Sequence, residues 1–266
     1  MAEIIGRGRT AEIYAWGEGK VLKLYFDWCN PEWIAQEFQA TQIAYTAGVP
    51  VPVPYELLEK EGRHGIVFER ISGNSLIAEF RRSPWKTNAL FRQMADLQVS
   101  CQAVAATRLR SLKASLERQV KKASAYGLTA GQIEAILDRL NHLPDGDQLC
   151  HMDFHPDNVM RTPHSLVVID WMNATCGPAM ADTARTWLML NVGGAPPGAE
   201  WMAPFISLVR KSGCSSYYQR LQKIKPFDRS ELDAWLLPVA AARLAEEIPG
   251  ERETLVGMVN QFLVKS

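Results

Sequence analysis

The amino-acid sequence predicts an α+β fold with a small β-rich N-terminal lobe and a larger α-helical C-terminal lobe. Two observations predict it. Short β-prone runs separated by glycines fill the chain before residue 72, whereas helical periodicity dominates almost everything after Gly73. This change of pattern is the one clear boundary in the sequence, so we expect an N-terminal lobe of residues 1–72 and a C-terminal lobe of residues 73–266.

Local signals predict the elements of the N-terminal lobe. Glycines separate three β-prone runs, which we expect to be strands at 4–5, 12–16 and 21–26. Asn30 supplies a capping side chain for a helix that has Pro31 at its first position and ends near Gly48. A hairpin is then expected from residues 55–59 and 65–70, around the sequence EGRHG.

Helical patterns dominate the C-terminal lobe. A helix is expected to begin at Ser83, with one apolar face formed by Leu90, Met94, Leu97 and Cys101. Thr129 and Gln132 form a predicted capping box at the start of another helix. Between these helices and the tail lies a short β-rich segment, with strands expected at 149–150 and 166–169.

The composition argues against several classes of protein. Lys plus Arg and Asp plus Glu both number 29, so the chain has no net charge with which to attract nucleic acid or an anionic membrane. We expect neither a signal peptide nor a membrane span, because no apolar run is long enough. The five cysteines are scattered, which favours buried thiols in a reducing compartment. We therefore expect a cytoplasmic protein without a nucleic-acid or membrane partner, and the sequence does not indicate its oligomeric state.

The stretch HMDFHPDN, which begins at His151, concentrates reactive side chains and has two interpretations. Pro156 favours an extended or looped backbone, on which His151, Asp153 and His155 share a face as zinc ligands would. Alternatively, the stretch matches the HxDxxxxN pattern of a phosphotransferase loop, with His151, Asp153 and Asn158 in register. In that hypothesis Asp153 is the general base and stays ionised at neutral pH.

Two patterns in the N-terminal lobe fit phosphoryl transfer, although each has an ordinary structural explanation. The turn that contains Gly6, Gly8 and Thr10 would let backbone N–H groups approach phosphates, or it would simply connect two strands. Lys23, in the strand VLKLYF, would contact the α- and β-phosphates with Glu37 as its partner, or it would face solvent.

Asp170 ends the buried run VVIDW, where the chain leaves a predicted strand. A carboxylate there would bind Mg²⁺ together with Asn158; the ordinary alternative is a turn aspartate. The glycine-rich turn, lysine, helix glutamate, hairpin, HxDxxxxN loop and strand-end aspartate follow one another in the order that phosphoryl transfer by a bilobal kinase requires. A zinc hydrolase would leave most of these features without a role, so the sequence favours phosphoryl transfer.

Together these motifs resemble the aminoglycoside phosphotransferase and choline kinase family, whose members have a bilobal protein-kinase-like fold. The resemblance covers residues 4–184 and rests on GRGRTAEIY, VLKLYF, Glu37, IVFERISG, LCHMDFHPDN, VVIDW and GPAMADTA. It implies a nucleotide-binding N-terminal lobe and a catalytic, substrate-binding C-terminal lobe. It also implies that ATP and Mg²⁺ are used to phosphorylate a hydroxyl group of a small molecule.

The resemblance implies further roles for individual residues. The adenine would lie against the backbone at Glu69 and Ile71. Asp182 would stabilise the catalytic loop from a buried position, and His151 would support the same loop by hydrogen bonding. His155 would approach the transferred phosphate. The other implied roles are those given above: Lys23 on the phosphates, Asp153 as base, and Asn158 and Asp170 on Mg²⁺.

Several residues depart from the family pattern and bear on the expected activity. Ala11 stands where the turn would have its third glycine, so the backbone would lie farther from the phosphates. Met152 stands where relatives often have glycine and protein kinases have arginine. Trp171 replaces the Phe-Gly that follows this aspartate in protein kinases, and the segment that reaches Asp182 is too short for a peptide platform. A protein kinase is therefore not expected, and the intact HxDxxxxN loop argues against an inactive nucleotide-binding module.

The tail is expected to form helices separated by breaks at 193–198, Pro226 and 249–250, and to border the acceptor site. From residue 183 to 266 it contains eight acids and ten bases, so it lacks the acidic excess that a polycationic antibiotic would require. Ser230 and Asp233 resemble a capping box, which gives two of the acids, Asp233 and Glu231, structural explanations.

The candidate acceptor residues in the tail are Glu246 and Glu247, with Trp201, Trp235 and Arg243 as possible walls. The alternative is that both glutamates face water. One or two carboxylates suit a monoamine or a neutral hydroxyl compound. The sequence therefore favours a metabolic kinase for a small neutral or singly charged alcohol over an antibiotic-resistance enzyme.

Overall fold

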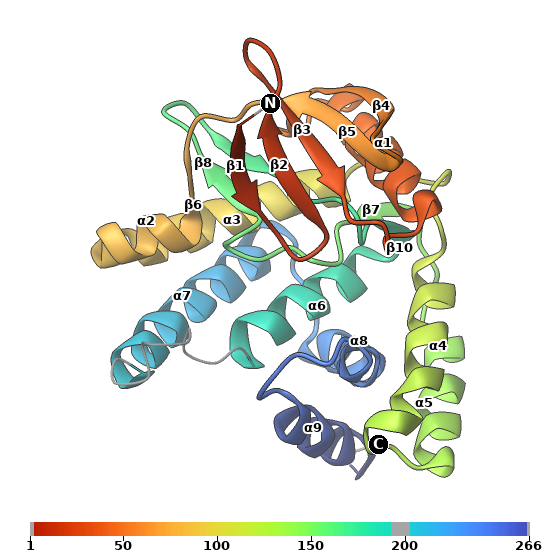
Figure 1. Ribbon diagram of the computed structural model, residues 1–266. Helices are drawn as coiled ribbons and strands as arrows, with labels where there is room; N and C mark the ends of the chain where they lie inside the picture. The colour runs from red at the N-terminus through yellow and green to blue at the C-terminus, as the bar shows by residue number, and fades with distance from the viewer. Residues whose placement is uncertain (1–2, 193–202, 265–266) are drawn as a thin grey trace.

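The computed structural model describes residues 3–192 and 203–264 of the chain. It confirms the α+β fold class, with a β-rich N-terminal lobe and a helical C-terminal lobe (Figure 1). The N-terminal lobe contains a five-stranded antiparallel sheet in the order β1-β2-β3-β5-β4. Its strands are β1 (Ile4–Arg7), β2 (Ala11–Ala15), β3 (Lys20–Tyr25), β4 (Pro54–Lys60) and β5 (Arg63–Glu69).

The central strand β3 shows why this sheet positions reactive groups. Successive side chains on a strand point to opposite faces, so Leu22 and Leu24 pack into one apolar cluster while Lys23 and Tyr25 face the helix α1 (Pro31–Thr46). This helix begins as predicted, because the side chain of Asn30 accepts a hydrogen bond from the first turn. The strand and the helix therefore bring their polar groups together inside the lobe.

Helix α1 also joins the two lobes. Its small residues Ala40 and Ala44 are fully buried and pack into a cluster that contains Leu90, Met94 and Val168 of the C-terminal lobe. A backbone hydrogen bond of 2.9 Å from Val168 to Pro50 adds a second link. The N-terminal lobe is therefore held against the C-terminal lobe on the side where α1 lies.

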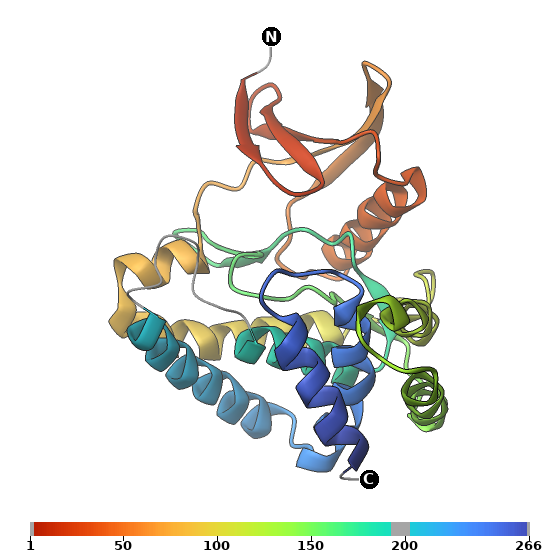
Figure 2. The same ribbon diagram turned by 60° about the horizontal axis from the view of Figure 1, so that its bottom comes forward.

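The C-terminal lobe is a helical bundle. Its predicted first long helix is α3, which follows a short 3₁₀ turn, and the expected face of Leu90, Met94, Leu97 and Cys101 is buried. Figure 2 shows α8 and α9 beside the pair α4 and α5, and α3 beside α7. The helices are α2 (Leu76–Arg82), α3 (Thr87–Gln102), α4 (Leu112–Lys122), α5 (Ala130–His142), α6 (Ala179–Val192), α7 (Ala203–Ile224), α8 (Arg229–Leu244) and α9 (Arg252–Val264).

Two small sheets lie between the lobes and hold the loop HMDFHPDN. One contains β6 (Asn74–Ser75), β8 (Val159–Arg161) and β9 (Leu166–Val168), and the other pairs β7 (Gln148–Cys150) with β10 (Thr175–Gly177). The loop runs from the end of β7 to the start of β8. The sequence predicted β7 and β9, which contain apolar runs, but not β6, β8 and β10, whose residues include polar or glycine positions without a strand pattern.

The two predicted capping boxes have different outcomes. At α5 the Thr129 hydroxyl and the Gln132 side chain make both reciprocal hydrogen bonds, which confirms the prediction. At α8 the prediction from Ser230 and Asp233 is wrong. The N-cap is Asp228, and Asp233 instead accepts a hydrogen bond of 2.8 Å from Arg229 one helical turn earlier.

The cysteines agree with the expectation of buried thiols. All five cysteines are free thiols, and four of them are buried. Among the described residues, no helix combines the length and the apolar character that a bilayer span requires.

Candidate active site

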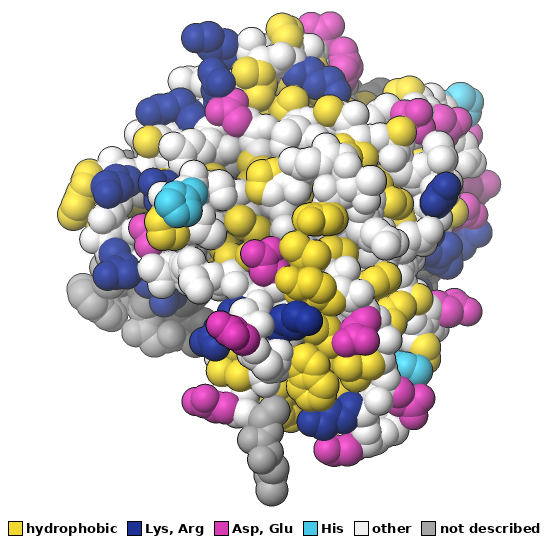
Figure 3. Space-filling model, turned by 90° about the horizontal axis from the view of Figure 1, so that it is seen from above, with side chains coloured by type: hydrophobic (Ala, Val, Ile, Leu, Met, Phe, Trp, Pro, Cys, Tyr) yellow, Lys and Arg dark blue, Asp and Glu magenta, His cyan; other side chains and the backbone are white. Residues whose placement is uncertain are grey.

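A large cleft lies between the lobes and has a volume of about 2100 Å³. Small-molecule pockets have volumes of about 300–1,000 Å³, so this cleft has room for two substrates side by side. Its walls come from the N-terminal sheet, the loop HMDFHPDN, α4 and the segment between α8 and α9. In the view of Figure 3, hydrophobic side chains form a band through the middle of the molecule, with acidic and basic side chains around it.

His151 is fully buried and lies outside the residues that line the cleft. Its Nε2 lies 3.1 Å from the Ile169 carbonyl oxygen, and its Nδ1 accepts a hydrogen bond of 3.2 Å from the backbone N–H of Asp153. The ring also contacts that of Trp171. Burial lowers the pKa of His151, which favours the neutral ring that this pair of contacts requires. The position fits the expected role of supporting the loop.

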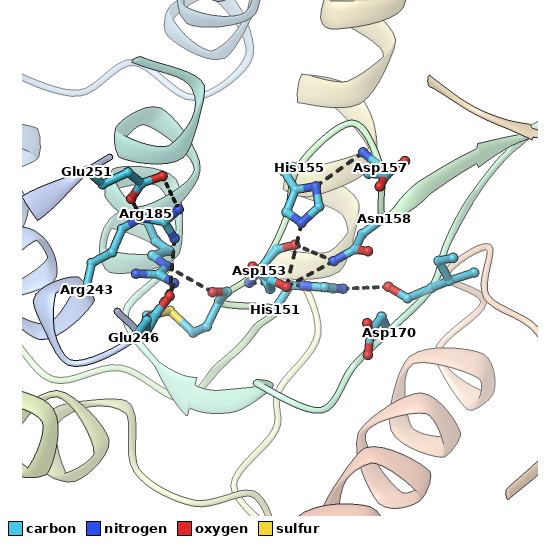
Figure 4. Close-up of polar contacts among 12 residues, drawn as sticks. His151, Asp153, His155, Asp157, Asn158, Asp170, Arg185, Arg243, Glu246 and Glu251 are labelled. Atoms are coloured by element: carbon cyan, nitrogen blue, oxygen red, sulfur yellow. Dashed lines mark hydrogen bonds and ion pairs between the residues drawn. The ribbon is translucent and has the colours of Figure 1, made fainter. Parts of the chain in front are cut away.

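The Asp153 carboxylate faces the cleft and contacts two polar side chains. The Asn158 side-chain amide donates to Oδ2 at 3.2 Å, and Nε2 of His155 lies 3.7 Å from the same oxygen (Figure 4). Burial by itself would raise the pKa of Asp153. The neighbouring His155, together with the charge of Arg185, outweighs burial and lowers that pKa well below its usual range. Asp153 is therefore ionised at neutral pH, as a proton acceptor must be.

Asp170 and Asn158 offer oxygen atoms to the same region of the cleft. Asp170 has a positive φ of 64°, which turns the chain at the end of β9, and its side chain remains 40% exposed. The amide nitrogen of Asn158 is used by two hydrogen bonds to Asp153, which leaves its Oδ1 available. Carboxylate and amide oxygens are ligands that Mg²⁺ prefers, so this pair fits the expected metal.

Lys23 connects the N-terminal lobe to this group. Its Nζ donates to Glu37 at 2.6 Å and to Asp170 at 2.8 Å, and Glu37 also accepts a hydrogen bond of 2.7 Å from the Tyr25 hydroxyl. Burial alone would lower the pKa of Lys23, but the carboxylates of Asp170 and Glu37 raise it above its ordinary value. The lysine is therefore positively charged and buried, with its charge directed at the cleft.

Of the other residues predicted to contact the nucleotide, all but Gly6 line the cleft. Gly8 and Thr10 line the cleft, and so do Glu69 and Ile71 at the edge between the lobes. Gly6 lies within β1 and is not among the lining residues. The glycine-rich turn is closed by a hydrogen bond of 2.9 Å from the Gly8 N–H to the carbonyl of Ala11, which begins β2.

Asp182 is completely buried beneath the loop and stabilises it, as expected. Its carboxylate accepts a hydrogen bond of 2.7 Å from the backbone N–H of Met152, and two more from Gln98 and Gln102 at 2.7 and 2.9 Å. The backbone of Met152 has a φ of 61°, a conformation that favours glycine. Sequence reasoning missed both glutamines, although two polar residues on the apolar face of α3 were a signal for a buried partner.

An ion-pair cluster lies beside Asp153, on the side away from Asp170 (Figure 4). Arg185 donates to both oxygens of Glu246 at 2.5 and 2.7 Å, and it also donates to the carbonyl of Met152 at 3.2 Å. Arg243 bonds Glu251 at 2.5 and 2.8 Å and Glu246 at 3.3 Å. The two positive charges of the arginines and the two negative charges of the glutamates therefore cancel. The sequence did not predict the partner residues Arg185 and Glu251.

The predicted acceptor residues of the tail have mixed outcomes. Arg243 and Glu246 line the cleft. Glu246 is paired with Arg185 and Arg243, so its carboxylate does not simply face water and is not free to bind an amine. Glu247 lies outside the cleft and accepts a hydrogen bond of 2.6 Å from Tyr126. The prediction of Trp235 as a wall is wrong, since this residue is 2% exposed within the helical core. Trp201 lies outside the described residues.

The alternative of a zinc hydrolase is not supported by this geometry. His151 points to the Ile169 carbonyl while His155 points to Asp153, so the side chains do not converge on one point. Among residues 3–192 and 203–264, no three His, Cys, Asp or Glu side chains form a group that would hold a metal ion.

Comparisons with known proteins agree with the kinase-like architecture. The model of the phosphotransferase enzyme family matches residues 2–223. A thermostable mutant of the aminoglycoside phosphotransferase APH(4)-Ia, solved with AMP-PNP and hygromycin B, matches with a TM-score of 0.68 and 14% identity, over 100% of this chain and 93% of that chain. A choline/ethanolamine kinase family protein from Mesorhizobium loti matches with a TM-score of 0.51 and 19% identity, over 98% and 92%. The streptomycin–ATP complex of APH(2″)-IIa matches with a TM-score of 0.61 and 16% identity, over 99% and 91%.

At these identities the solved structures establish the fold and nothing more specific. No curated protein sequence matches the chain.

Proposed function

Because this chain belongs to the phosphotransferase enzyme family and is a small-molecule phosphotransferase, we propose that it transfers the γ-phosphate of ATP to a hydroxyl group of a small metabolite. The observation that carries the proposal is the arrangement of charges across one cleft. Lys23, which is buried and held by Glu37 and Asp170, lines the same cleft as the ionised carboxylate of Asp153, and the Asn158 side chain donates a hydrogen bond to that carboxylate. Phosphoryl transfer requires such a combination of a cation for the phosphates and a proton acceptor for the nucleophile.

On the donor side, the adenine would lie at Glu69 and Ile71, and the phosphates would extend toward Lys23 beneath the turn with Gly8 and Thr10. Two of the similar structures are complexes with ATP or its analogue AMP-PNP, which supports a nucleoside triphosphate as the donor. Asn158 and Asp170 would hold Mg²⁺, which neutralises phosphate charge when bound.

In the proposed reaction, Asp153 accepts the proton of the acceptor hydroxyl as its oxygen forms a bond to the γ-phosphorus. The bond between that phosphorus and the bridging oxygen breaks, and ADP leaves. Lys23 stabilises the negative charge on the phosphates, and the contact with His155 keeps the Asp153 carboxylate ionised until it takes the proton. His155 also lines the cleft, where it would approach the transferred phosphate.

For the acceptor, the charges favour a small neutral or singly charged alcohol. Both carboxylates that border the cleft beside Asp153, Glu246 and Glu251, are already neutralised by Arg185 and Arg243. An antibiotic with several amines would need unpaired carboxylates to replace the water around each ammonium group. A sensitive bacterium that expresses the protein should therefore gain no resistance to kanamycin-like drugs. Strong protection, together with efficient drug phosphorylation in vitro, would contradict this.

The proposed activity is tested by measuring ADP release from Mg-ATP in the presence of sugars, amino alcohols and hydroxy acids. We expect release with at least one alcohol, together with formation of a phosphate monoester that ³¹P NMR detects. If Mg-ATP stabilises the protein against heat but no alcohol gives product, the protein is a nucleotide-binding module and not an enzyme.

A further inference from the structure

The wall of the cleft along α4 carries positive charge that the nucleotide site does not use. Arg110 precedes this helix, Arg118 and Lys122 lie on it, and all three line the cleft together with the apolar Leu112 and Leu116. The wall begins next to Asp170, because the Arg110 guanidinium donates to the carbonyl of Met172 at 3.0 Å. It then continues for about 15 Å along the C-terminal lobe, at a helical rise of about 1.5 Å per residue.

Arg110 has an unused donor in a buried position. Its Nε is buried and has no hydrogen-bond partner, and no carboxylate lies within ion-pair distance of it among the described residues. Burial, and then the positive charge of Arg118, lower the pKa of Arg110. A guanidinium nevertheless remains charged in proteins, so this side chain is a cation without a counterion.

Thr175 adds a second unused group at the same place. Its residue is 2% exposed, and its hydroxyl is buried and unpartnered within the part of the chain that the structure describes. The next residue in β10, Cys176, donates a backbone hydrogen bond of 2.9 Å to the carbonyl of Arg110, so the two segments are adjacent. Both residues line the cleft. Buried polar groups are rarely left unpaired, and two neighbouring ones indicate a missing ligand.

The charges on this side of the cleft do not balance. Arg185 and Arg243 are neutralised by Glu246 and Glu251, as described above. Arg118 donates to the Ser115 hydroxyl at 3.1 Å, and its charge helps to lower the pKa of the neighbouring Glu117, which does not line the cleft. Among the described residues, none of Arg110, Arg118 and Lys122 forms an ion pair, so the α4 wall presents three positive charges that are not held by a carboxylate.

We infer that the acceptor alcohol carries an anionic group, a carboxylate or a phosphate ester, which binds at Arg110 and Thr175 with added attraction from Arg118 and Lys122. The inference rests on the proposed function, since the hydroxyl of the same molecule gives its proton to Asp153. Guanidinium groups bind carboxylates and phosphates through paired N–H donors. An acceptor with an ammonium group is repelled by the same charges.

The test compares acceptors that share a hydroxyl-bearing skeleton and differ in charge. The probes are glycerol, glycerate and glycerol 3-phosphate; glucose, gluconate and glucose 6-phosphate; and the amines ethanolamine and choline. We expect kcat/KM with Mg-ATP to be at least about tenfold higher for an anionic member than for its neutral counterpart, the loss expected for one charge-assisted hydrogen bond. The comparison of carboxylate with phosphate members identifies the anion.

Substitutions test whether the preference for anionic acceptors arises from the residues of the α4 wall. Thr175→Val, Arg118→Gln and Lys122→Gln should each raise KM for the preferred anion, with KM for ATP unchanged. Arg108→Gln and Lys121→Gln are matched controls, because both residues are exposed neighbours of the wall that do not line the cleft. Binding of glycerol 3-phosphate and glycerate to the protein saturated with AMP-PNP, measured by calorimetry, gives the same comparison without turnover.

The possible outcomes are distinct. Turnover with neutral alcohols or amines in preference to every anionic probe would overturn this inference and leave the proposed function intact. The same holds if the wall variants behave like their controls. Absence of turnover with any alcohol, despite binding of Mg-ATP, would instead contradict the proposed function. An anionic preference that Arg118→Glu reverses in favour of amines would establish the inference.

Discussion

Single side chains set the charge state of the reacting groups in this cleft. Asp153 is mostly buried, which by itself disfavours a carboxylate, but His155 and the charge of Arg185 reverse that effect. His151 shows the opposite balance, because burial dominates and keeps it neutral. Two residues that lie two positions apart in the chain therefore have opposite environments, since Asp153 faces the cleft and His151 is buried within the loop.

Asp153→Asn should lose most of its phosphotransferase activity while it still binds Mg-ATP. Removal of a general base costs about two to four orders of magnitude in rate, and the amide keeps the size of the side chain. The measurement is kcat with the best acceptor, alongside nucleotide affinity. Asp157→Asn is the matched control, since it changes an exposed acid of the same loop and should retain activity. Near-normal turnover in Asp153→Asn would contradict its assignment as the base.

His155→Gln should move the acid limb of the pH–rate profile to higher pH. In the native protein His155 is the main group that lowers the pKa of Asp153, so the carboxylate loses activity only at low pH. Without the imidazole, less opposes the effect of burial, so the pKa of Asp153 rises. The profile of kcat/KM shows the shift, and above pH 7 the rate should recover if His155 acts only through Asp153. A loss that persists there would indicate that His155 contacts the phosphate.

At the scale of elements, helix packing positions the loop HMDFHPDN and leaves little room for larger side chains between the helices. Helices α3 and α7 pack so closely that a Cβ atom at Gly213 would lie 2.6 Å from the ring of Phe91. Helix α3 is also the element that sends Gln98 and Gln102 to Asp182. The packing of α7 on α3 therefore supports the loop from a distance.

Gly213→Ala should destabilise the protein by about 1–3 kcal/mol, because the added methyl group forces Phe91 out of its place. Gly257→Ala in α9 is the matched control. Nothing lies within 4 Å of its Cβ position, so it should be neutral or stabilise the protein by about 0.5–1 kcal/mol. Urea unfolding measures both. Equal midpoints for the two variants would show that α3 and α7 are packed less closely than described.

The sequence predicted elements well where the signal is local and poorly where it is not. The cap at Asn30 and the box at Thr129 are formed by residues three or fewer positions apart, so the pattern alone is sufficient. At α8 the ion pair of Arg229 with Asp233 competes with the apparent box. The strand β8 depends on pairing with β6, more than eighty residues earlier, which no local pattern reveals. Likewise, Asp153 and Asp182 follow from motifs, whereas their respective neighbours Arg185 and Gln98 depend on tertiary contacts.

At the scale of the whole molecule, the site exists only where the two lobes meet. Lys23 and Glu37 belong to one lobe, and Asp153, Asn158 and Asp170 belong to the other. A nucleotide bound in the cleft would contact both lobes and therefore stabilise the assembly as a whole. The numbers of acidic and basic residues in the tail follow from the sequence, but which of them form ion pairs does not. The pairing of Glu246 with Arg185 is therefore seen only in the structure.

Mg-ATP should raise the melting temperature of the protein, and Asp170→Ala should lose most of this effect. A ligand at one hundred times its Kd stabilises the folded state by about 2.7 kcal/mol, which corresponds to several degrees for a chain of this size. The measurement is a thermal shift with ATP, with and without Mg²⁺. Asp138→Ala, which removes an exposed acid of α5, is the control. If Asp170→Ala responds to Mg-ATP like the native protein, Asp170 is a turn residue and not a ligand.

The ion pair between Lys23 and Asp170 makes nucleotide binding an exchange reaction. The ammonium group already has two anionic partners, so an incoming triphosphate competes with a carboxylate and does not fill a vacant position. The released Asp170 is then free to turn toward the metal that accompanies the nucleotide, which couples the two binding events. Dissolved salt weakens both the ion pair of Lys23 with Asp170, which is lost, and the ion pair of Lys23 with the triphosphate, which is formed. The two effects on nucleotide affinity therefore partly cancel. We therefore expect nucleotide affinity to depend less steeply on ionic strength than the charge of ATP alone would suggest.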